Sequence, residues 1–328
     1  IAEEVPFIRP GYPAYREFIE KEIGIQMNIF YLPGADINKH LKTSFSDWAK
    51  RPIVSITREK AIIRFRELSD RSPAQANQAF RVLRAWFNYA IGAYQTDGVP
   101  IISENPVKAI SDLKMWNHVK PRSGRIPTDK IGAAWNELQR LREIAGQTTI
   151  SRTLADAVTF LMLTGARWSE MAELTWDRVN IKEGHWHIPD PKNRTSITFP
   201  LSQVAVDMLK DRPQVDGYVF PARTATGHIR EARSVLASLS KAAGTHITAH
   251  DLRRTFRAIA GECGIDFWKT KLLMGHKIAG DITITHYTET SDLRYLAEDI
   301  NRIGDWIVRQ GAIVAAGNVV PFPVKTGV

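Results

Sequence analysis

Apolar residues recur at three- and four-residue spacing along most of the chain, which is the pattern of amphipathic helices. Residues 72–94 show it most clearly, with Ser72 as the expected N-cap and Pro73 at the first helical position. A second helix is predicted at 57–70, with Thr57 as its N-cap. The first hundred residues therefore predict a small helical bundle.

The second half of the chain combines helical spacing with a short alternating pattern. HWHI (185–188) and TSITFPL (195–201) alternate around the turn PKNR (191–194), which predicts a β-hairpin. Further helices are predicted at 128–144, 151–163, after the Thr164-Gly165 break, and at 228–243, 248–263, 266–274 and 291–310. We expect a mainly α fold with a small antiparallel β-sheet or hairpin: a helical domain followed by a mixed α+β domain.

A stretch rich in Pro, Gly and basic residues, 104–129, separates the two patterns, and 117–127 is predicted to be the linker. The expected domains are residues 1–116 and 128–310. The apolar tail, 311–328, is predicted to dock on a neighbouring protomer, with packing inside its own chain as the alternative. The chain starts with Ile rather than Met, which is compatible with a fragment that lacks an upstream domain.

Charge narrows the class of partner. Lys and Arg outnumber Asp and Glu by 44 to 35 and the pI is about 9.6, which favours a polyanion such as nucleic acid. The single cysteine, Cys263, rules out an intramolecular disulfide and indicates a reducing compartment. No apolar run is long enough for a membrane span, and the N-terminus does not resemble a signal peptide. We expect a cytoplasmic, nucleoid-associated protein.

Positive charge gathers on one side of the predicted helix 248–263. At 100° per residue, the apolar stripe lies on one side of the helix, and four polar residues lie on the other: His250, Arg253, Arg254 and Arg257. Arg253 is near the edge of the buried stripe, where it can be held rigidly, whereas Arg254 lies further out. Such a face is either solvated or a phosphate-binding surface, and periodicity alone does not distinguish the two. His246 and His250 have the spacing of a zinc pair, but no Glu follows His246, so no metal site is predicted.

Other segments of the second half carry residues suited to phosphate chemistry. In chain order they are Arg167 and Glu170 in TGARWSE, Lys192 at the hairpin turn, His276 in LLMGHK and Tyr287 in HYTE. Together with H-D-L-R at 250–253, this series resembles the catalytic domain of the tyrosine recombinases, the phage integrase family. That family has T-G-x-R-x-x-E, a hairpin Lys, H-x-x-R, G-H and a Tyr in the same order. The resemblance covers about residues 125–300.

The resemblance implies a site-specific DNA recombinase that cuts and rejoins duplex DNA through a 3′-phosphotyrosine, without metal, cofactor or ATP. The roles it implies are Tyr287 as nucleophile, Arg167 and Arg253 as the phosphate clamp, His250 as proton acceptor, His276 as hydrogen-bond donor, Lys192 as general acid and Glu170 as support for Arg167. Duplex DNA and a homo-oligomer, a tetramer in the synaptic complex, are the implied partners. Further DNA contacts are predicted at Arg81, Arg84, Lys120, Arg122, Arg125 and Arg254.

Alternatives remain open at this point. His276 and Tyr287 are eleven residues apart, whereas the family usually has about nine, and Tyr295 is the rival nucleophile. A type IB topoisomerase-like enzyme uses similar residues. A catalytically inactive DNA-binding protein of the same fold is the third possibility, and the complete set of six candidate catalytic residues counts against it.

Overall fold

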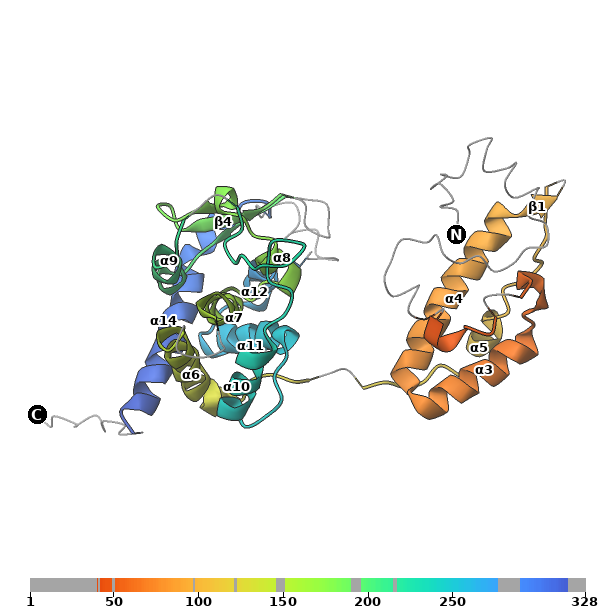
Figure 1. Cartoon of the computed structure of the whole chain (residues 1–328), viewed down its shortest axis with the longest axis horizontal. Coiled ribbons are helices and arrows are strands. Elements are labelled where there is room, and N and C mark those ends of the chain that lie inside the picture. The colour runs from red at the N-terminus through yellow and green to blue at the C-terminus, as the bar shows by residue number, and fades with distance from the viewer. Residues whose placement is uncertain are drawn as a thin grey trace, which may run out of the picture. The chain divides into compact units, whose positions relative to one another are not determined.

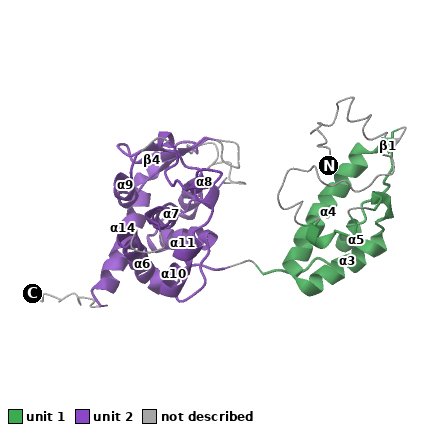
Figure 2. Cartoon of the chain, viewed as in Figure 1, with its two compact units in different colours: residues 1–121 green, residues 122–328 purple. Residues whose placement is uncertain are grey.

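The chain divides into two compact units, residues 1–121 and 122–328, coloured green and purple in Figure 2. The computed structural model describes residues 40, 42–48, 51–96, 98–120, 123–145, 151–189, 196–214, 217–276 and 290–317. The division at residues 121 and 122 falls within the stretch predicted as a linker. Each unit has its own hydrophobic core, so the two are described separately.

The first unit is built on two long helices, α3 (Arg58–Arg71) and α4 (Pro73–Ala93), which pack together (Figure 1). Thr57 caps α3 by accepting a hydrogen bond from the backbone N–H of Lys60 at 3.4 Å. Ser72 occupies the N-cap position of α4, as predicted, but its side chain makes no capping hydrogen bond. A short helix and a two-stranded antiparallel ribbon complete the described part: α5 (Lys108–Asp112), β1 (Gln95–Thr96) and β2 (Val99–Pro100).

Aromatic side chains fill the core between α3 and α4. Phe65 and Phe80 meet edge to face with ring centroids 4.9 Å apart, and Phe45 contacts the same cluster. The apolar stripe predicted for 72–94 is buried in this core, including Leu83 and Phe87. Burial of each such side chain stabilises the fold by about 1.5–3 kcal/mol.

The end of the first unit contains part of the Pro- and Gly-rich stretch. Residues 108–112 form α5, and Val107 and Ile110 are fully buried, so the first part of this stretch belongs to the packed unit. Asn77 of α4 donates to the carbonyl of Asn117 at 2.8 Å and accepts from its N–H at 3.1 Å. This pair fixes the chain where the predicted linker begins.

The second unit is mostly helical with one small antiparallel sheet, which confirms the predicted fold class (Figure 1). The sheet has the order β3-β4-β5, and Ile188 of β4 pairs with Ile197 of β5, which places the predicted hairpin. In chain order the elements are α6 (Ile131–Glu143), α7 (Arg152–Thr164), α8 (Trp168–Ala172), β3 (Val179–Asn180), β4 (His185–Ile188), β5 (Ile197–Pro200), α9 (Gln203–Lys210), α10 (Arg233–Ala243), α11 (Ala249–Glu262), α12 (Phe267–Leu273) and α14 (Ala297–Ala315). In the described part of the chain, no helix combines the length and hydropathy needed to cross a bilayer.

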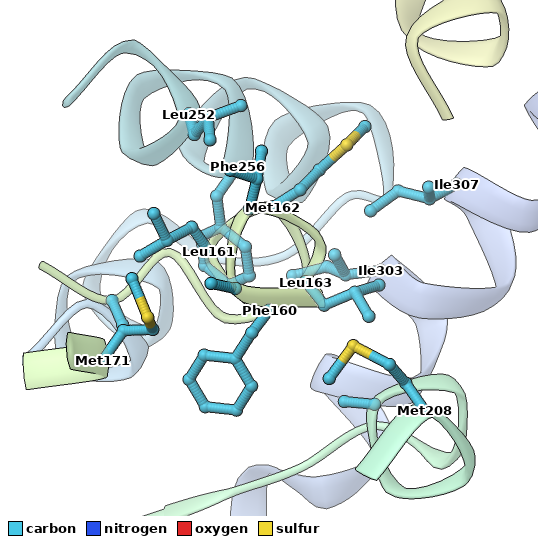
Figure 3. Close-up of a cluster of buried hydrophobic side chains, with 14 of the residues drawn as sticks. Phe160, Leu161, Met162, Leu163, Met171, Met208, Leu252, Phe256, Ile303 and Ile307 are labelled. Carbon is cyan, nitrogen blue, oxygen red and sulfur yellow. The ribbon is translucent and has the colours of Figure 1, made fainter. Parts of the chain in front are cut away.

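Helix α7 is the centre of the second unit. Every residue from Ala155 to Thr164 is buried, so the helix is enclosed on all sides. Figure 3 shows its side chains Phe160–Leu163 surrounded by residues of four other helices: Met171, Met208, Leu252, Phe256, Ile303 and Ile307. The functional loop described below follows directly from this rigid helix.

The C-terminal helix α14 packs closely along α6. A Cβ atom on Gly132 would lie 2.2 Å from the carbonyl oxygen of Gln310, and one on Gly311 would lie 2.4 Å from Trp135, so glycine is required at both contacts. The helix continues to Ala315, beyond the predicted end at 310. The first residues of the predicted tail therefore complete α14 within its own chain, and 318–328 lie outside the described residues.

Two local predictions in the second unit differ from the structure. Helix α10 begins at Arg233 rather than 228, because His228 forms an antiparallel bridge with Pro221. Helix α9 was not predicted, although Ser202 caps it by accepting from the N–H of Ala205 at 3.3 Å. Its short apolar run follows a strand directly, and periodicity over so few residues does not separate helix from strand.

A buried ion cluster ties α6 and α7 to the segment after α9. The fully buried carboxylate of Asp156 accepts from Arg142 at 2.7 Å and from Arg152 at 3.2 Å, and it also contacts Arg212. Arg212 in turn donates to the carbonyl of Val219 at 2.7 Å. Burial lowers the pKa of Arg212, against the opposing effect of Asp156. This set is called the Asp156 cluster below.

Candidate active site

The guanidinium of Arg253, on α11, is the point at which three segments meet. It donates through Nη1 to the carbonyl of Gly165 at 2.6 Å and through Nη2 to the carbonyl of Met274. The same Nη2 lies 2.8 Å from Nε2 of His276. Arg253 is only 4 % exposed. The loop after α7, the first half of α11 and the segment after α12 are thus joined through one side chain.

Two glycines give these segments their shape. Gly165 ends α7 in the left-handed conformation, with φ of 63°, and its N–H closes the last turn on Leu161. A Cβ atom there would lie 2.6 Å from the ring of Phe256, so α11 also packs too closely for a side chain. Gly275 follows α12 with the same φ of 63°. Both turns bring a backbone carbonyl to the guanidinium of Arg253.

Arg167 lies next to this meeting point, at the N-cap of α8. The carboxylate of Glu170 accepts from the backbone N–H of Arg167 at 2.7 Å and contacts its guanidinium, as the i, i+3 spacing suggested. A Cβ atom on Gly275 would lie 3.9 Å from Nη1 of Arg167. The Arg167 side chain is 30 % exposed. The two predicted arginines therefore lie on either side of the Gly275-His276 turn, one buried and one partly open.

Electrostatics follow from this crowding of cations. Burial, with the charge of Arg167 in addition, lowers the pKa of Arg253 to about 10, which leaves it charged at neutral pH. Partial burial of the ring, then the charges of Arg253 and Arg167, lower the pKa of His276 to about 4. The imidazole is therefore neutral near pH 7. Since Nε2 accepts from Arg253, the proton resides on Nδ1, which can donate to a ligand.

The start of α11 separates its two adjacent arginines. Asp251 accepts from the N–H and hydroxyl of Thr248, at 2.9 and 2.6 Å, and so caps the helix. It also pairs with Arg254. Burial would raise the pKa of Asp251, but the bonds from Thr248 and Arg254 outweigh it and the pKa is lowered. Arg254 is thus partly exposed and held by the buried Asp251 carboxylate, whereas Arg253 is buried, and His250 is exposed on the first turn.

The structure leaves three predicted residues undescribed. Lys192 falls in the connection between β4 and β5, and Tyr287 and Arg122 also lie outside the described residues. The rival Tyr295 is 50 % exposed in a 3₁₀ turn. The remaining predicted DNA contacts, Arg81, Arg84, Lys120 and Arg125, are exposed, the first two on α4.

The end of the predicted linker contacts α11, which the sequence did not indicate. The N–H of Ile126 donates to the hydroxyl of Thr255 at 2.9 Å, and Ile126 is completely buried. A Cβ atom on Gly124 would lie 2.7 Å from the carboxylate of Asp251. Residues 123–126 therefore pack along α11, the helix that carries Arg253.

The surroundings of the Cys263 thiol favour a structural role over a chemical one. Cys263 packs beside the core and burial raises the pKa of its thiol, which disfavours a reactive thiolate. Within the described ranges, no three His, Cys, Asp or Glu side chains are placed to hold a metal ion.

Comparisons with known proteins agree on one family. The model of the Phage integrase family matches residues 134–294. Prophage integrase IntF of Escherichia coli (strain K12) is 31% identical over 171 residues, covering 48% of this chain and 35% of that protein. A putative integrase/recombinase of Haemophilus influenzae is 25% identical over 197 residues, covering 57% of this chain and 50% of that protein. The matched part is thus half or less of each curated relative's length.

Solved structures share the fold. A lambda integrase dimer bound to a COC′ core site has a TM-score of 0.53 at 18% identity, covering 84% of this chain and 76% of that one. The Tn1549 transposon integrase, in complex with a circular intermediate DNA, has a TM-score of 0.54 at 16% identity, covering 84% and 94%. At these identities the likeness concerns the fold alone.

Proposed function

From the premise that this chain belongs, through its second unit, to the phage integrase family of tyrosine recombinases, we propose that it is a site-specific DNA recombinase. In the proposed reaction Tyr287 attacks a DNA phosphodiester and forms a 3′-phosphotyrosine, and the broken strand is then joined to a new partner. Because one phosphoester replaces another, the bond energy is conserved and the reaction needs no ATP and no metal.

The observation that supports this proposal best is the state of Arg253. Its charge is almost completely buried, yet in the described part of the chain its hydrogen bonds go to two carbonyls and an imidazole and to no carboxylate. A buried charge without a counter-ion in contact is costly, and an anion bound beside it would offset that cost. A DNA phosphate fits, because a guanidinium offers a planar fork of donors that matches phosphate oxygens.

The other side chains have roles that follow from their positions and chemistry. Arg167, supported by Glu170, supplies the second guanidinium of the clamp. Nδ1–H of His276 donates to a phosphate oxygen, and the donors stabilise the extra charge of the transition state because they are already in place. His250 accepts the proton of the Tyr287 phenol, whose free pKa is about 10.

Proton balance assigns a role to one further residue. The departing 5′ oxygen needs a proton, and Lys192, in the hairpin connection, is proposed to give it. On rejoining, the 5′ hydroxyl of the new partner strand attacks the phosphotyrosine and gives its proton to Lys192, and the tyrosine leaves with the proton that His250 had accepted.

DNA is the proposed partner of both units. The basic residues Arg81 and Arg84 of α4, Lys120, Arg122 and Arg125 of the linker, and Arg254 of α11 are proposed to contact the backbone, which would make binding salt-dependent. Strand exchange needs two duplexes, so we propose a tetramer on DNA, acting on the nucleoid in the cytoplasm. The domain limits 1–116 and 128–310 stay a proposal. Since residues 311–315 complete α14 in their own chain, only the rest of the predicted tail is proposed to dock on a neighbouring protomer.

Covalent capture tests the proposed function. The protein is incubated with a pool of duplexes that carry a randomised core and a nick, so that a cleaved end diffuses away and the protein stays attached. Adducts that survive detergent are recovered and sequenced. We expect wild-type protein to select one core sequence, Tyr287→Phe to form no adduct, and Tyr295→Phe to form it normally.

Three results would contradict the proposal in different ways. An adduct formed by Tyr287→Phe but not by Tyr295→Phe would assign the nucleophile to Tyr295. If wild-type protein binds the duplexes but never attaches to them, the chain is a DNA-binding protein without strand cleavage. Relaxation of a supercoiled plasmid without any selected core would favour the topoisomerase-like alternative.

A further inference from the structure

An exposed aromatic ring contacts two cations, one of which, Arg257, lies one helical turn beyond Arg253 on α11. Phe267, the first residue of α12, is 53 % exposed. The guanidinium carbon of Arg257 lies 4.7 Å from the centre of its ring, and Nζ of Lys271 lies 4.6 Å from the same centre. Both distances are typical of cation–π contacts, so the ring fixes two positive groups on α11 and α12.

In the described part of the chain, neither of these cations, Arg257 and Lys271, forms an ion pair with a carboxylate. Nearby cations on the same helices are paired: Arg254 with Asp251, and Lys269 with Asp299. Two like charges held at one ring repel each other, and an anion between them would remove that cost. The absence of an acid at this point therefore favours an anionic ligand.

The charges of Arg257 and Lys271 influence the candidate active site. Arg257 and Lys271 are both among the cations that lower the pKa of His276, so they lie close to its ring. Arg257 follows Arg253 by four residues, which is about one turn, or about 5.4 Å along α11. Successive phosphates of one strand advance about 3.4 Å along the duplex axis. The spacing fits a phosphate one or two nucleotides away from the one held by Arg253.

We propose that Arg257, Lys271 and Phe267 form a second phosphate site, which binds the DNA backbone beside the phosphate that is cleaved. This proposal rests on the proposed function, because it takes the cleaved phosphate as its reference point. The second site sets the register of the strand, so that the correct phosphate reaches Arg167 and Arg253. Phe267 holds the two cations apart and in place, and it needs no contact with a base for this role.

Salt dependence of binding tests the charges. The probe is a duplex recovered by covalent capture, and its affinity is measured at several salt concentrations. Arg257→Gln combined with Lys271→Gln is expected to weaken binding about 10-fold and to reduce the slope of log K against log salt by about 0.9, the value for one lost phosphate contact. The control, Lys241→Gln, removes an exposed cation from α10 and should leave both quantities unchanged.

Neutral phosphates test the position. Methylphosphonate replaces one phosphate at a time on either side of the cleaved one. Wild-type protein should lose about 10-fold in affinity at one position within two nucleotides, and the double variant should lose nothing further there. Phe267→Ala keeps both charges, so the salt slope should stay while affinity falls about 3-fold.

The outcomes separate this site from the proposed function. If wild-type protein forms the covalent adduct but shares its salt slope and its methylphosphonate profile with the double variant, the second site is wrong and the proposed function stands. If wild-type protein forms no adduct with any duplex, the proposed function fails and this site fails with it. A Phe267→Ala variant with wild-type affinity would show that the ring does not organise the cations.

Discussion

The second unit contains two arginine clusters that are built in opposite ways. In the Asp156 cluster, three guanidiniums contact one fully buried carboxylate. Around Arg253, the guanidinium is bound by backbone carbonyls and a neutral imidazole, and the nearby carboxylate of Glu170 contacts Arg167 instead. In the first cluster, the carboxylate of Asp156 offsets the positive charge. The second holds its cations rigidly and leaves their charge available to a ligand.

The comparison shows what distinguishes an arginine that holds the fold together from one suited to ligand binding. Burial is similar, since Arg212 is 8 % exposed and Arg253 is 4 % exposed. Both donate to backbone carbonyls. The difference is the acid: Arg212 contacts a carboxylate, whereas no carboxylate among the residues that the structure describes contacts Arg253. A carbonyl satisfies a donor without cancelling its charge, so it can position a cation without neutralising it.

Loss of the acid from the Asp156 cluster should have the largest effect. Asp156→Asn removes a buried counter-charge shared by three arginines, of which Arg212 is itself buried, and we expect a loss of about 3–5 kcal/mol in the free energy of unfolding. Chemical denaturation measures it. Asp211→Asn, at a carboxylate 67% exposed and 3.9 Å from two of these arginines, is the control and should change stability by less than about 0.5 kcal/mol. Equal losses would show that Asp156 does not organise the cluster.

Loss of the Arg253 guanidinium should affect the reaction rather than the fold. Arg253→Lys keeps a charge but loses the planar fork, so the rate of adduct formation should fall about 10²–10³-fold. We expect the free energy of unfolding to fall by only about 1–2 kcal/mol, from the lost bonds to Gly165 and Met274. Quenched-flow kinetics and thermal unfolding measure the two quantities.

The adjacent residue is a matched control for this variant. Arg254→Lys changes an arginine that is paired with Asp251, and it should slow adduct formation by less than about 10-fold. If Arg253→Lys were to destabilise the protein as strongly as Asp156→Asn while reacting normally, the contrast between the two clusters would be lost.

Glu170 should show a smaller, divided effect. Its carboxylate orients Arg167 but also competes with a phosphate for that guanidinium. For Glu170→Gln we expect DNA affinity that is unchanged or up to about 3-fold tighter, with adduct formation about 10-fold slower. Glu173→Gln, at an exposed position three residues later, is the control. A parallel loss of affinity and rate would mean that Glu170 supports binding in general and not the orientation of Arg167.

The smallest effect concerns the protonation of His276. Its folded pKa is lowered to about 4, so the ring stays neutral as pH falls from 7 to about 5, while an unfolded chain takes up a proton near its ordinary value of 6.5. Stability contributed by this group therefore falls with decreasing pH between about 6.5 and 4. An NMR titration of the imidazole should give a midpoint near 4. A midpoint above 6 would contradict the hydrogen bond from Arg253 to Nε2.

Local pattern was enough to predict most elements of the fold, because long helices repeat the same spacing several times. The stripe over 72–94 and the capped helix at 248–263 are both present, as α4 and α11. The same angular argument placed Arg253 beside the buried stripe, and it is buried in the structure. The helix wheel also separated Arg253 from Arg254, whose contacts proved to be different.

Contacts between distant segments could not be predicted in this way. The carbonyls that hold Arg253 belong to residues 88 and 21 positions away along the chain, and a backbone carbonyl has no signature in the sequence. Nothing in the sequence indicates the contact between Ile126 and Thr255 either, since these residues are 129 positions apart. The contact between Phe267 and Arg257 could not be predicted either, because it depends on the angle between α11 and α12, which residue spacing does not give.

Gly165 limits how far this pocket can be altered by protein engineering. Its φ of 63° disfavours any side chain, its missing Cβ makes room for Phe256, and its carbonyl holds Arg253. If this loop were randomised, nearly all variants that replace Gly165 would therefore fail to fold. Changes meant to alter substrate preference must start elsewhere, at positions such as the exposed Arg257 and the partly exposed Lys271, which add positive charge near the pocket without shaping its backbone.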